Sequence, residues 1–227
     1  MPVEASAHGP AGATLDAPVP RDRDYLSEPE AIYARSFAII DAETDWSGVP
    51  ADLRPVVRRM IHACGMTDIV ADLAWSADVV GRASAALAAG APVICDARMV
   101  AHGVIHAMLP AQNAVVCALD RVDGGAPAGT TRSAAGMDAL ATALDGAVVA
   151  VGNAPTALFR LLELAEAGRV APAAMVALPV GFVGAAESKR ALADAAPCPF
   201  LTLHGRRGGS AMAAAAVNAL ATTAARP

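Results

Sequence analysis

Short apolar runs alternate with longer segments of helical periodicity over most of the chain. Unbroken runs of four or five apolar residues predict strands that are buried on both faces. In the segments between them, apolar residues recur at helical spacing and predict helices. The predicted strands are residues 92–95, 114–118, 147–151, 174–178 and 200–203. The predicted helices are residues 77–89, 133–144, 155–167, 186–195 and 210–225. This alternation predicts an α/β fold with three α/β/α layers around a five-stranded, mainly parallel, flavodoxin-like sheet.

Two further helices are predicted before the alternating region. One begins at Glu28, and the other covers residues 52–64 with Pro55 in its first turn, where proline is tolerated. Residues 1–24 are rich in Pro, Gly, Ala and Asp and show no period, which predicts a flexible N-terminal arm. Because no linker or repeat interrupts the rest, residues 25–227 are predicted to form a single domain.

The composition narrows the possible partners and the compartment. The 227 residues include 55% apolar side chains, many of them alanine, and carry a net charge of −5 with no basic block. A nucleic-acid partner is therefore not expected, because phosphate binding needs a basic stripe. No segment predicts a signal peptide or a membrane span. The four cysteines form no Cys-x-x-Cys pair and lie in or beside apolar runs, which favours free thiols in a reducing cytoplasm.

Residues 59–65 read Arg-Met-Ile-His-Ala-Cys-Gly and carry the strongest local sign of chemistry. Arg59 and His62 are three positions apart and share one face of the predicted helix, and Gly65 suits the left-handed residue that ends it. His62 then lies in the last turn, where unpaired carbonyl groups favour a protonated imidazole. Two interpretations stay open on this pattern: a proton donor beside an anion-binding arginine, or a histidine that only caps the helix.

Polar residues follow the predicted strands, at the end of the sheet where α/β proteins bind ligands. Arg206 and Arg207 precede a Gly-Gly-Ser turn that opens the last helix, an arrangement that suits a carboxylate or phosphate and equally suits a solvated turn. Asp96 follows one strand, and Asn153 follows another at a position where asparagine also caps helices. The pattern predicts an anion site without separating ligand-binding residues from structural ones.

Several familiar sites are absent from the sequence. No Gly-x-Gly-x-x-Gly or Gly-x-x-x-x-Gly-Lys-Ser motif indicates a nucleotide site, and no Gly-x-Ser-x-Gly motif indicates a serine hydrolase. His102 and His106 have the spacing of metal ligands on a helix, but no third ligand lies near them in the sequence, so no metal or other cofactor is expected. A hydrolase that uses Cys64 beside His62 is disfavoured, since residues two apart do not face each other on a helix.

Seven segments together resemble the precorrin-8X methylmutases, or precorrin isomerases, of cobalamin biosynthesis. They run from about Tyr25 to the C-terminus and are residues 31–40, 59–65, 96–100, 131–134, 152–160, 179–189 and 205–212. The resemblance implies an isomerase that moves a methyl group between adjacent carbons at ring C of precorrin-8X and forms hydrogenobyrinate by a [1,5]-sigmatropic shift. It further implies a redox-neutral reaction without a cofactor, and a homodimer with shared active sites. The residues before Tyr25 depart from the family.

The resemblance also implies roles for particular side chains. His62 matches the family's catalytic histidine, and Ser36 matches a substrate-contacting serine with Tyr33 and Arg35 beside it in the sequence. The remaining candidate anchors for the substrate carboxylates are Arg59, Arg132, Asn153, Lys189, Arg206 and Arg207. Two alternatives stay open: a substrate that carries cobalt, and a noncatalytic α/β module that binds a tetrapyrrole or a nucleotide.

Overall fold

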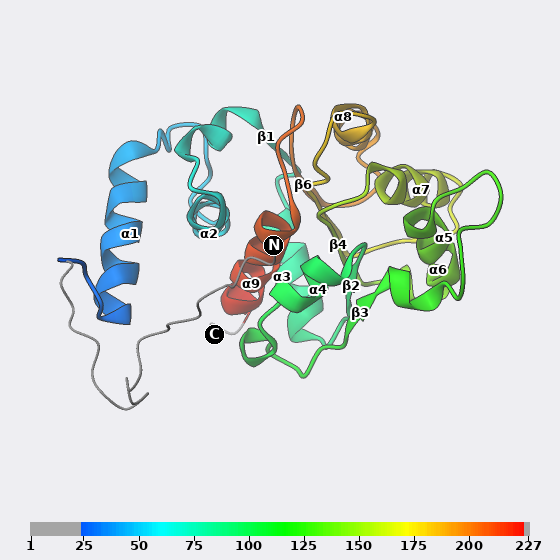
Figure 1. Cartoon of the computed structure of the whole chain (residues 1–227), viewed down its shortest axis with the longest axis horizontal. Helices are drawn as coiled ribbons and strands as arrows, with labels where there is room; N and C mark the ends of the chain where they lie inside the picture. The colour runs from blue at the N-terminus through cyan, green and yellow to red at the C-terminus, as the bar shows by residue number, and fades with distance from the viewer. Residues whose placement is uncertain (1–23, 225–227) are drawn as a thin grey trace, which may run out of the picture. The chain divides into compact units, whose positions relative to one another are not determined.

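The computed structural model describes residues 24–224 (Figure 1). These residues divide into a first unit, residues 24–35, and a second unit, residues 36–224. The predicted N-terminal arm lies outside the described residues except for Asp24, and the single domain expected over residues 25–227 stays a prediction.

The first unit contains the beginning of α1 (Pro29–Glu43), whose later turns belong to the second unit. The Glu28 carboxylate accepts the backbone N–H groups of Glu30 and Ala31, at 3.2 and 2.6 Å. These bonds satisfy N–H groups that have no partner within the first turn of a helix, so α1 begins where the sequence predicted.

The second unit is built on a six-stranded sheet with the order β1-β6-β5-β4-β2-β3 (Figure 1). Its strands are β1 (Leu73–Trp75), β2 (Val93–Cys95), β3 (Val115–Cys117), β4 (Val148–Val151), β5 (Ala174–Ala177) and β6 (Phe200–Leu203). Strands β2 to β6 pair in parallel, and counted among themselves they follow the 2-1-3-4-5 order of flavodoxin. The five predicted strands and the flavodoxin-like topology are confirmed.

Strand β1 is a sixth strand that the sequence analysis did not predict. It pairs antiparallel with β6, with Ala74 opposite Thr202. A strand of 3 residues is too short to show a period, and it follows a 3-10 helix, η1 (Thr67–Asp72), rather than a turn motif. Its existence therefore depends on the edge that β6 offers.

The helices of the second unit largely follow the predicted boundaries. They are α2 (Arg54–Cys64), α3 (Val79–Ala88), α4 (Arg98–Gly103), α5 (Arg132–Ala139), α6 (Ala141–Leu144), α7 (Pro155–Glu166), α8 (Ala185–Ala195) and α9 (Ser210–Ala224), with short 3-10 helices η2 (His106–Met108) and η3 (Ala118–Arg121). Helix α4 was not predicted from the sequence. One helix was predicted over residues 133–144, but the chain turns at Leu140 and forms two helices.

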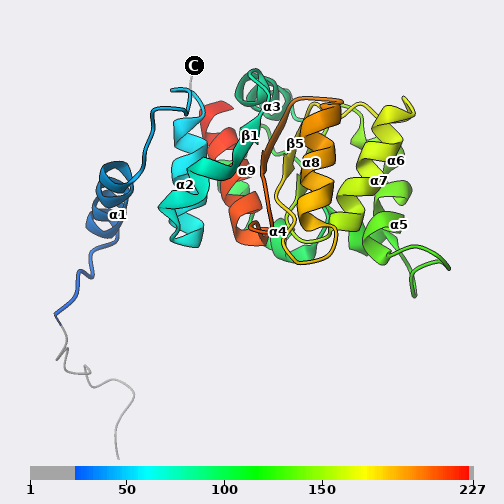
Figure 2. The ribbon, with the colours of Figure 1, turned by 90° about the horizontal axis from the view of Figure 1, so that it is seen from above.

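Alternate strand residues face two separate hydrophobic clusters, as a parallel sheet with helices on both faces requires. On one face, Val148 and Ala150 of β4 belong to a cluster with residues of α2, α3 and α9. On the other face, Val149 and Val151 belong to a cluster with residues of α5 to α8. Figure 2 shows α9 and α8 on opposite sides of the strands. The predicted three-layer architecture is confirmed.

Candidate active site

Asp96 lies at the carboxyl end of β2, next to the point where the strand order reverses. Its buried carboxylate accepts the backbone N–H groups of Gly152, Asn153 and Ala154, at 2.9, 3.0 and 2.6 Å. Burial raises the pKa of this carboxyl, and the three N–H donors oppose that shift. Asp96 thus holds the turn between β4 and α7 at the place where flavodoxin-like proteins bind ligands. This role of Asp96 could not be predicted from the sequence, because its partners lie 56 to 58 residues later.

His62 occupies the last turn of α2, and its side chain is exposed. Gly65 ends the helix with a φ of 72°, and its N–H donates to the carbonyl of Ile61 at 2.7 Å. The positive φ explains why glycine suits this position. The opposite face of α2 buries Val57 and Met60 completely, so packing of that face directs His62 away from the core.

His62 and Ser36 line the same hollow, of about 310 Å³. The later turns of α1 contribute Ser36, Ile39 and Glu43, and the region after α2 contributes Thr67. The imidazole also contacts the ring of Phe37, with the two centroids 5.3 Å apart. The structure therefore brings together the two residues that the resemblance singled out most strongly.

Three other residues predicted from this part of the sequence are not among those that line this hollow. Arg59, one turn before His62, lines a neighbouring hollow of about 300 Å³ together with Phe37. Tyr33 and Arg35 are exposed residues of the first unit. Their contact with a substrate stays a prediction.

The loop between β6 and α9 holds Arg206 and forms part of a third hollow. Glycine is required at Gly208, because a Cβ there would lie 2.7 Å from the carbonyl oxygen of Pro179. The hollow measures about 260 Å³ and is lined by Met66, Val180, Gly181, Phe182, Arg206, Arg207 and Gly208. The guanidinium of Arg206 lies 5.1 Å from the centroid of the Phe182 ring, a cation–π arrangement.

Arg207 and Lys189 already have protein partners. The Arg207 guanidinium forms ion pairs with Asp68, at 2.7 Å, and with Asp72. The side chain of Lys189 is fully buried, and its Nζ donates to the backbone carbonyl of Arg207 at 2.5 Å. Burial lowers the pKa of Lys189 to about 8, with a smaller opposing effect of Asp72. In this geometry the ammonium of Lys189 does not reach the surface, contrary to what a direct substrate anchor requires.

Arg132 and Asn153 lie on exposed segments at the start of α5 and before α7. One Nη of Arg132 donates weakly to the carbonyls of Leu119 and Val122, at 3.4 and 3.5 Å. The backbone N–H of Asn153 donates to Asp96, as described above. Neither residue lines the hollow that contains His62 and Ser36.

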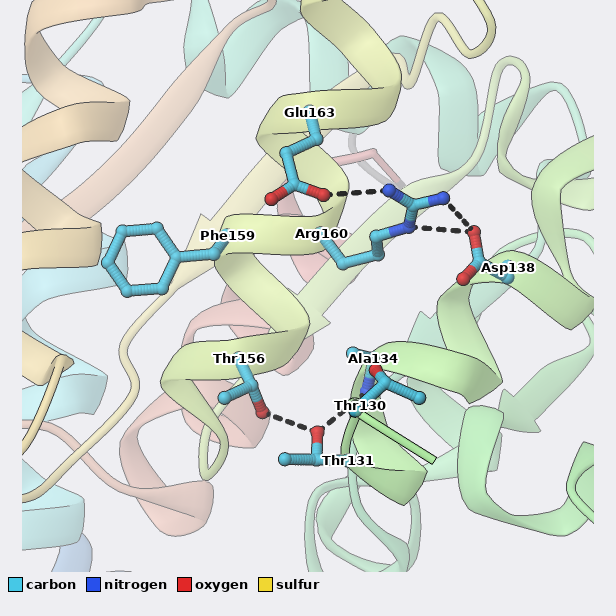
Figure 3. Close-up of a pocket in the computed structure, with 9 residues that line it drawn as sticks. Thr130, Thr131, Ala134, Asp138, Thr156, Phe159, Arg160 and Glu163 are labelled. Carbon is cyan, nitrogen blue, oxygen red and sulfur yellow. Dashed lines mark hydrogen bonds and ion pairs between the residues drawn. The ribbon is translucent and has the colours of Figure 1, made fainter. Parts of the chain in front are cut away.

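The hollow between α5 and α7 is larger, about 660 Å³, and contains residues that the sequence analysis did not select (Figure 3). The Thr131 hydroxyl accepts the Ala134 N–H, as a helix N-cap does, and bonds the Thr156 hydroxyl at 2.8 Å. Arg160 pairs with Asp138 and Glu163, each at 2.7 Å (Figure 3). Since the polar groups of this hollow bond one another, they give no specific sign of a ligand.

Two alternatives from the sequence analysis can be compared with the geometry. Partial burial raises the pKa of the Cys64 thiol, which disfavours the thiolate that a cysteine nucleophile needs. Over residues 24–224, no group of three or more His, Cys, Asp and Glu side chains is placed to hold a metal ion. Within the same range, no helix has the length and apolar character needed to cross a membrane.

Comparison with known proteins gives a consistent family assignment. The family model of precorrin-8X methylmutase matches residues 31–223. Precorrin-8X methylmutases from Pseudomonas aeruginosa and Sinorhizobium sp are 55% and 52% identical, covering 88% and 87% of this chain and 98% and 96% of their own. A cobalt-precorrin-8 methylmutase from Salmonella typhimurium is 35% identical over 86% of this chain and 96% of its own.

The fold agrees with a solved structure. The crystal structure of precorrin-8X methylmutase from Thermus thermophilus superimposes with a TM-score of 0.78 at 40% identity, covering 86% of this chain and 96% of that chain. The family model's match over residues 31–223 includes the α2 segment that carries His62 and the loop that carries Arg206. The chain belongs to the precorrin-8X methylmutase family.

Proposed function

We propose that this protein is an isomerase that converts precorrin-8X to hydrogenobyrinate in cobalamin biosynthesis, by moving one methyl group between adjacent carbons of ring C. Family membership over residues 31–223 supports the activity. The observation that supports a specific active site is that His62 and Ser36 line the same hollow at the end of α2.

In this proposal His62 acts as the general acid. Its side chain is exposed in the last turn of α2 and lines the same hollow as Ser36, where a substrate can reach it. The imidazolium gives a proton at ring C, the methyl group migrates within the molecule, and a proton returns to the imidazole. Substrate and product are isomers, so the sequence of steps needs no oxidant or reductant and no bound cofactor.

The carboxylates around the macrocycle need cationic or hydrogen-bonding anchors. We assign Arg206 as the best-placed anchor, because it is exposed and its hollow also offers the apolar surface of Phe182 and Met66. Ser36 is the anchor nearest His62. Weaker support extends the proposed set of substrate contacts to Tyr33, Arg35, Arg59, Arg132 and Asn153.

The metal-free substrate is favoured over its cobalt analogue. The two relatives named precorrin-8X methylmutase are 55% and 52% identical to this chain, whereas the relative named for cobalt-precorrin-8 from Salmonella typhimurium is 35% identical. We further propose a homodimer with shared active sites, as the family resemblance implies. A cytoplasmic location is supported by four free cysteines, two of them buried.

The deciding experiment is turnover of purified full-length protein with precorrin-8X, followed by the visible spectrum of the product. We expect complete conversion without added nicotinamide, flavin or metal, and unchanged rates after exhaustive chelation. Parallel incubation with cobalt-precorrin-8 measures the preference between the two substrates. Tight product binding without turnover would instead identify a noncatalytic tetrapyrrole-binding module.

A further inference from the structure

Arg207 joins three segments that are far apart in the sequence. Its guanidinium contacts Asp68 and Asp72 of η1, which precede it by 139 and 135 residues, and its carbonyl accepts the Nζ of Lys189 on α8. We propose that Arg207 is a positioning residue that holds the loop between β6 and α9 against η1, and thereby sets where Arg206 stands relative to His62. The inference rests on the proposed function for its catalytic meaning.

The bonding of Arg207 leaves little capacity for a substrate. Nη1 donates to Asp68 at 2.7 Å and Nη2 donates to Asp72, so both ends of the guanidinium fork are occupied by carboxylates. The side chains of Arg207 and Asp72 are 32% and 35% exposed, so their ion pair is less screened by solvent than a fully exposed one, whereas Asp68 is 73% exposed. A substrate carboxylate at this position would also meet the negative charge of Asp68 and Asp72.

Arg206 differs from Arg207 in every one of these respects. No carboxylate among residues 24–224 forms an ion pair with it, and its side chain is exposed beside Phe182. Its backbone carbonyl accepts the N–H of Gly181 at 3.2 Å, which ties this residue to the loop after β5. The two adjacent arginines therefore have different tasks: Arg206 presents donors to the hollow, and Arg207 holds the loop in place.

The segment that Arg207 grips is continuous with the end of α2. Residues 63–66 connect His62 to η1, which begins at Thr67. Gly65 and Thr67 line the hollow of His62, whereas Met66 between them lines the hollow of Arg206. A further bond from the His204 N–H to the Asp72 carbonyl, at 2.7 Å, fixes the same junction. A shift of the loop would change the spacing between the proposed acid and the proposed anchor, and such small displacements slow catalysis.

Lys189 supports the same arrangement from the core. A fully buried lysine is costly unless its ammonium is hydrogen-bonded, and here it donates to the backbone of Arg207 itself. The bond holds the peptide group on one side while the two aspartates hold the guanidinium on the other. This gives Lys189 a role in placing the loop rather than in direct substrate contact.

The first test needs no substrate. Amide-resolved hydrogen exchange on the full chain monitors the N–H of Gly209, which donates to Leu178, and the N–H of Gly181, which donates to Arg206. We expect Arg207→Gln and Asp72→Asn each to speed exchange at both amides by about tenfold, because the loop opens more often. The exposed neighbour of Lys189 supplies the matched control, Arg190→Gln, which leaves both rates unchanged.

The second test measures product affinity and turnover. If Arg207 is a positioning residue, it acts through Asp72, so Asp72→Asn and Arg207→Gln should both lower kcat. Because the two changes remove the same contact, kcat of the double variant should be within about twofold of kcat of the worse single variant. Arg207→Lys, which can reach one carboxylate but lacks the fork, gives intermediate exchange and intermediate kcat. If Arg207 bound the substrate directly, Asp72→Asn would leave affinity unchanged or improve it while Arg207→Gln weakened it.

The outcomes separate this inference from the proposed function. Unchanged exchange rates in both Arg207→Gln and Asp72→Asn would contradict the positioning role of Arg207, whichever substrate the enzyme converts. If exchange is faster in these variants but the parent protein fails to convert precorrin-8X, the positioning role of Arg207 is supported and the proposed function is rejected. If Arg207→Gln does not fold, Asp68→Asn and Asp72→Asn remove the same contacts while keeping the arginine, and their exchange rates decide the question.

Discussion

The ring of Phe37 lies against the imidazole of His62, with centroids 5.3 Å apart and an angle of 51° between the planes. Phe37 comes from a later turn of α1 and His62 from the last turn of α2, so two helices meet at the proposed acid. A tilted contact of this kind restricts rotation of the imidazole. It also places an apolar ring beside the group that carries a proton in the proposed mechanism.

We expect Phe37→Leu to lower kcat by about 2- to 10-fold, because aromatic pairs contribute about 0.5–1.5 kcal/mol beyond burial and leucine keeps only the burial. Product affinity should change less than kcat, since the substitution frees the imidazole rather than an anchor. Phe159→Leu, in the hollow between α5 and α7, is the matched control. Equal kcat values for the two variants would remove Phe37 from the positioning of His62.

His62→Ala should lower kcat by about 10²–10⁴-fold, the usual contribution of a general acid. The fold should persist, because His62 is exposed and the packing of α2 depends on residues of its opposite face, such as Val57. Single-turnover kinetics with precorrin-8X measures the chemical step, and fluorescence titration measures product binding. A variant that turns over within a factor of a few of the parent would leave His62 as a helix cap.

Arg206→Ala should weaken product binding, because a lost charge-assisted contact costs about 1.5–3 kcal/mol. The rate of the bound step should fall much less. The comparison variant is Arg160→Ala, which removes an arginine already paired with Asp138 and Glu163 in another hollow. Affinities that fall equally in both variants would point to a general loss of positive charge rather than to a contact made by Arg206.

Asp96→Asn should destabilise the second unit by about 1–3 kcal/mol, because an amide nitrogen replaces an oxygen that accepts a buried backbone N–H. For a chain of this size, the melting temperature should fall by several degrees. Asp145→Asn is the matched control, since Asp145 is exposed and accepts only the N–H of Ala171 in the described hydrogen bonds. Similar losses in both variants would show that burial of Asp96 adds nothing.

Lys189 should make the free energy of unfolding depend on pH in the alkaline range. Burial lowers its pKa from 10.5 to about 8, so between these values the unfolded chain binds the proton that the folded chain has released. Stability therefore rises with pH across this window, by about 3 kcal/mol at most, and the cost of the buried charge is fully present below pH 8. Urea unfolding of the parent and Lys189→Met should show this rise only in the parent, with Arg190→Met as control.

Local periodicity was enough to predict five strands, the main helices and their flavodoxin-like order. Burial on both faces leaves an unbroken apolar run in a strand such as residues 147–151, and this mark is local to the run. The same local signals placed His62 in the last turn of α2, because the stop at Gly65 depends on a residue only three positions away. Resemblance over seven segments then supplied the family.

Tertiary structure alone decided the rest, and the reason is distance along the chain. Strand β1 has 3 residues and exists by pairing with β6. Arg206 and Arg207 cannot be told apart in the sequence. Their roles differ because Asp68 and Asp72, well over a hundred residues earlier, bind the guanidinium of Arg207. From the sequence, Lys189 is expected to be an exposed anchor for a substrate carboxylate. The fold instead buries it completely, and its Nζ donates to the backbone carbonyl of Arg207. Residues that are distant in the sequence but close in the fold decide which polar side chains bind the protein itself and which are available to a ligand. A local sequence pattern does not include these residues.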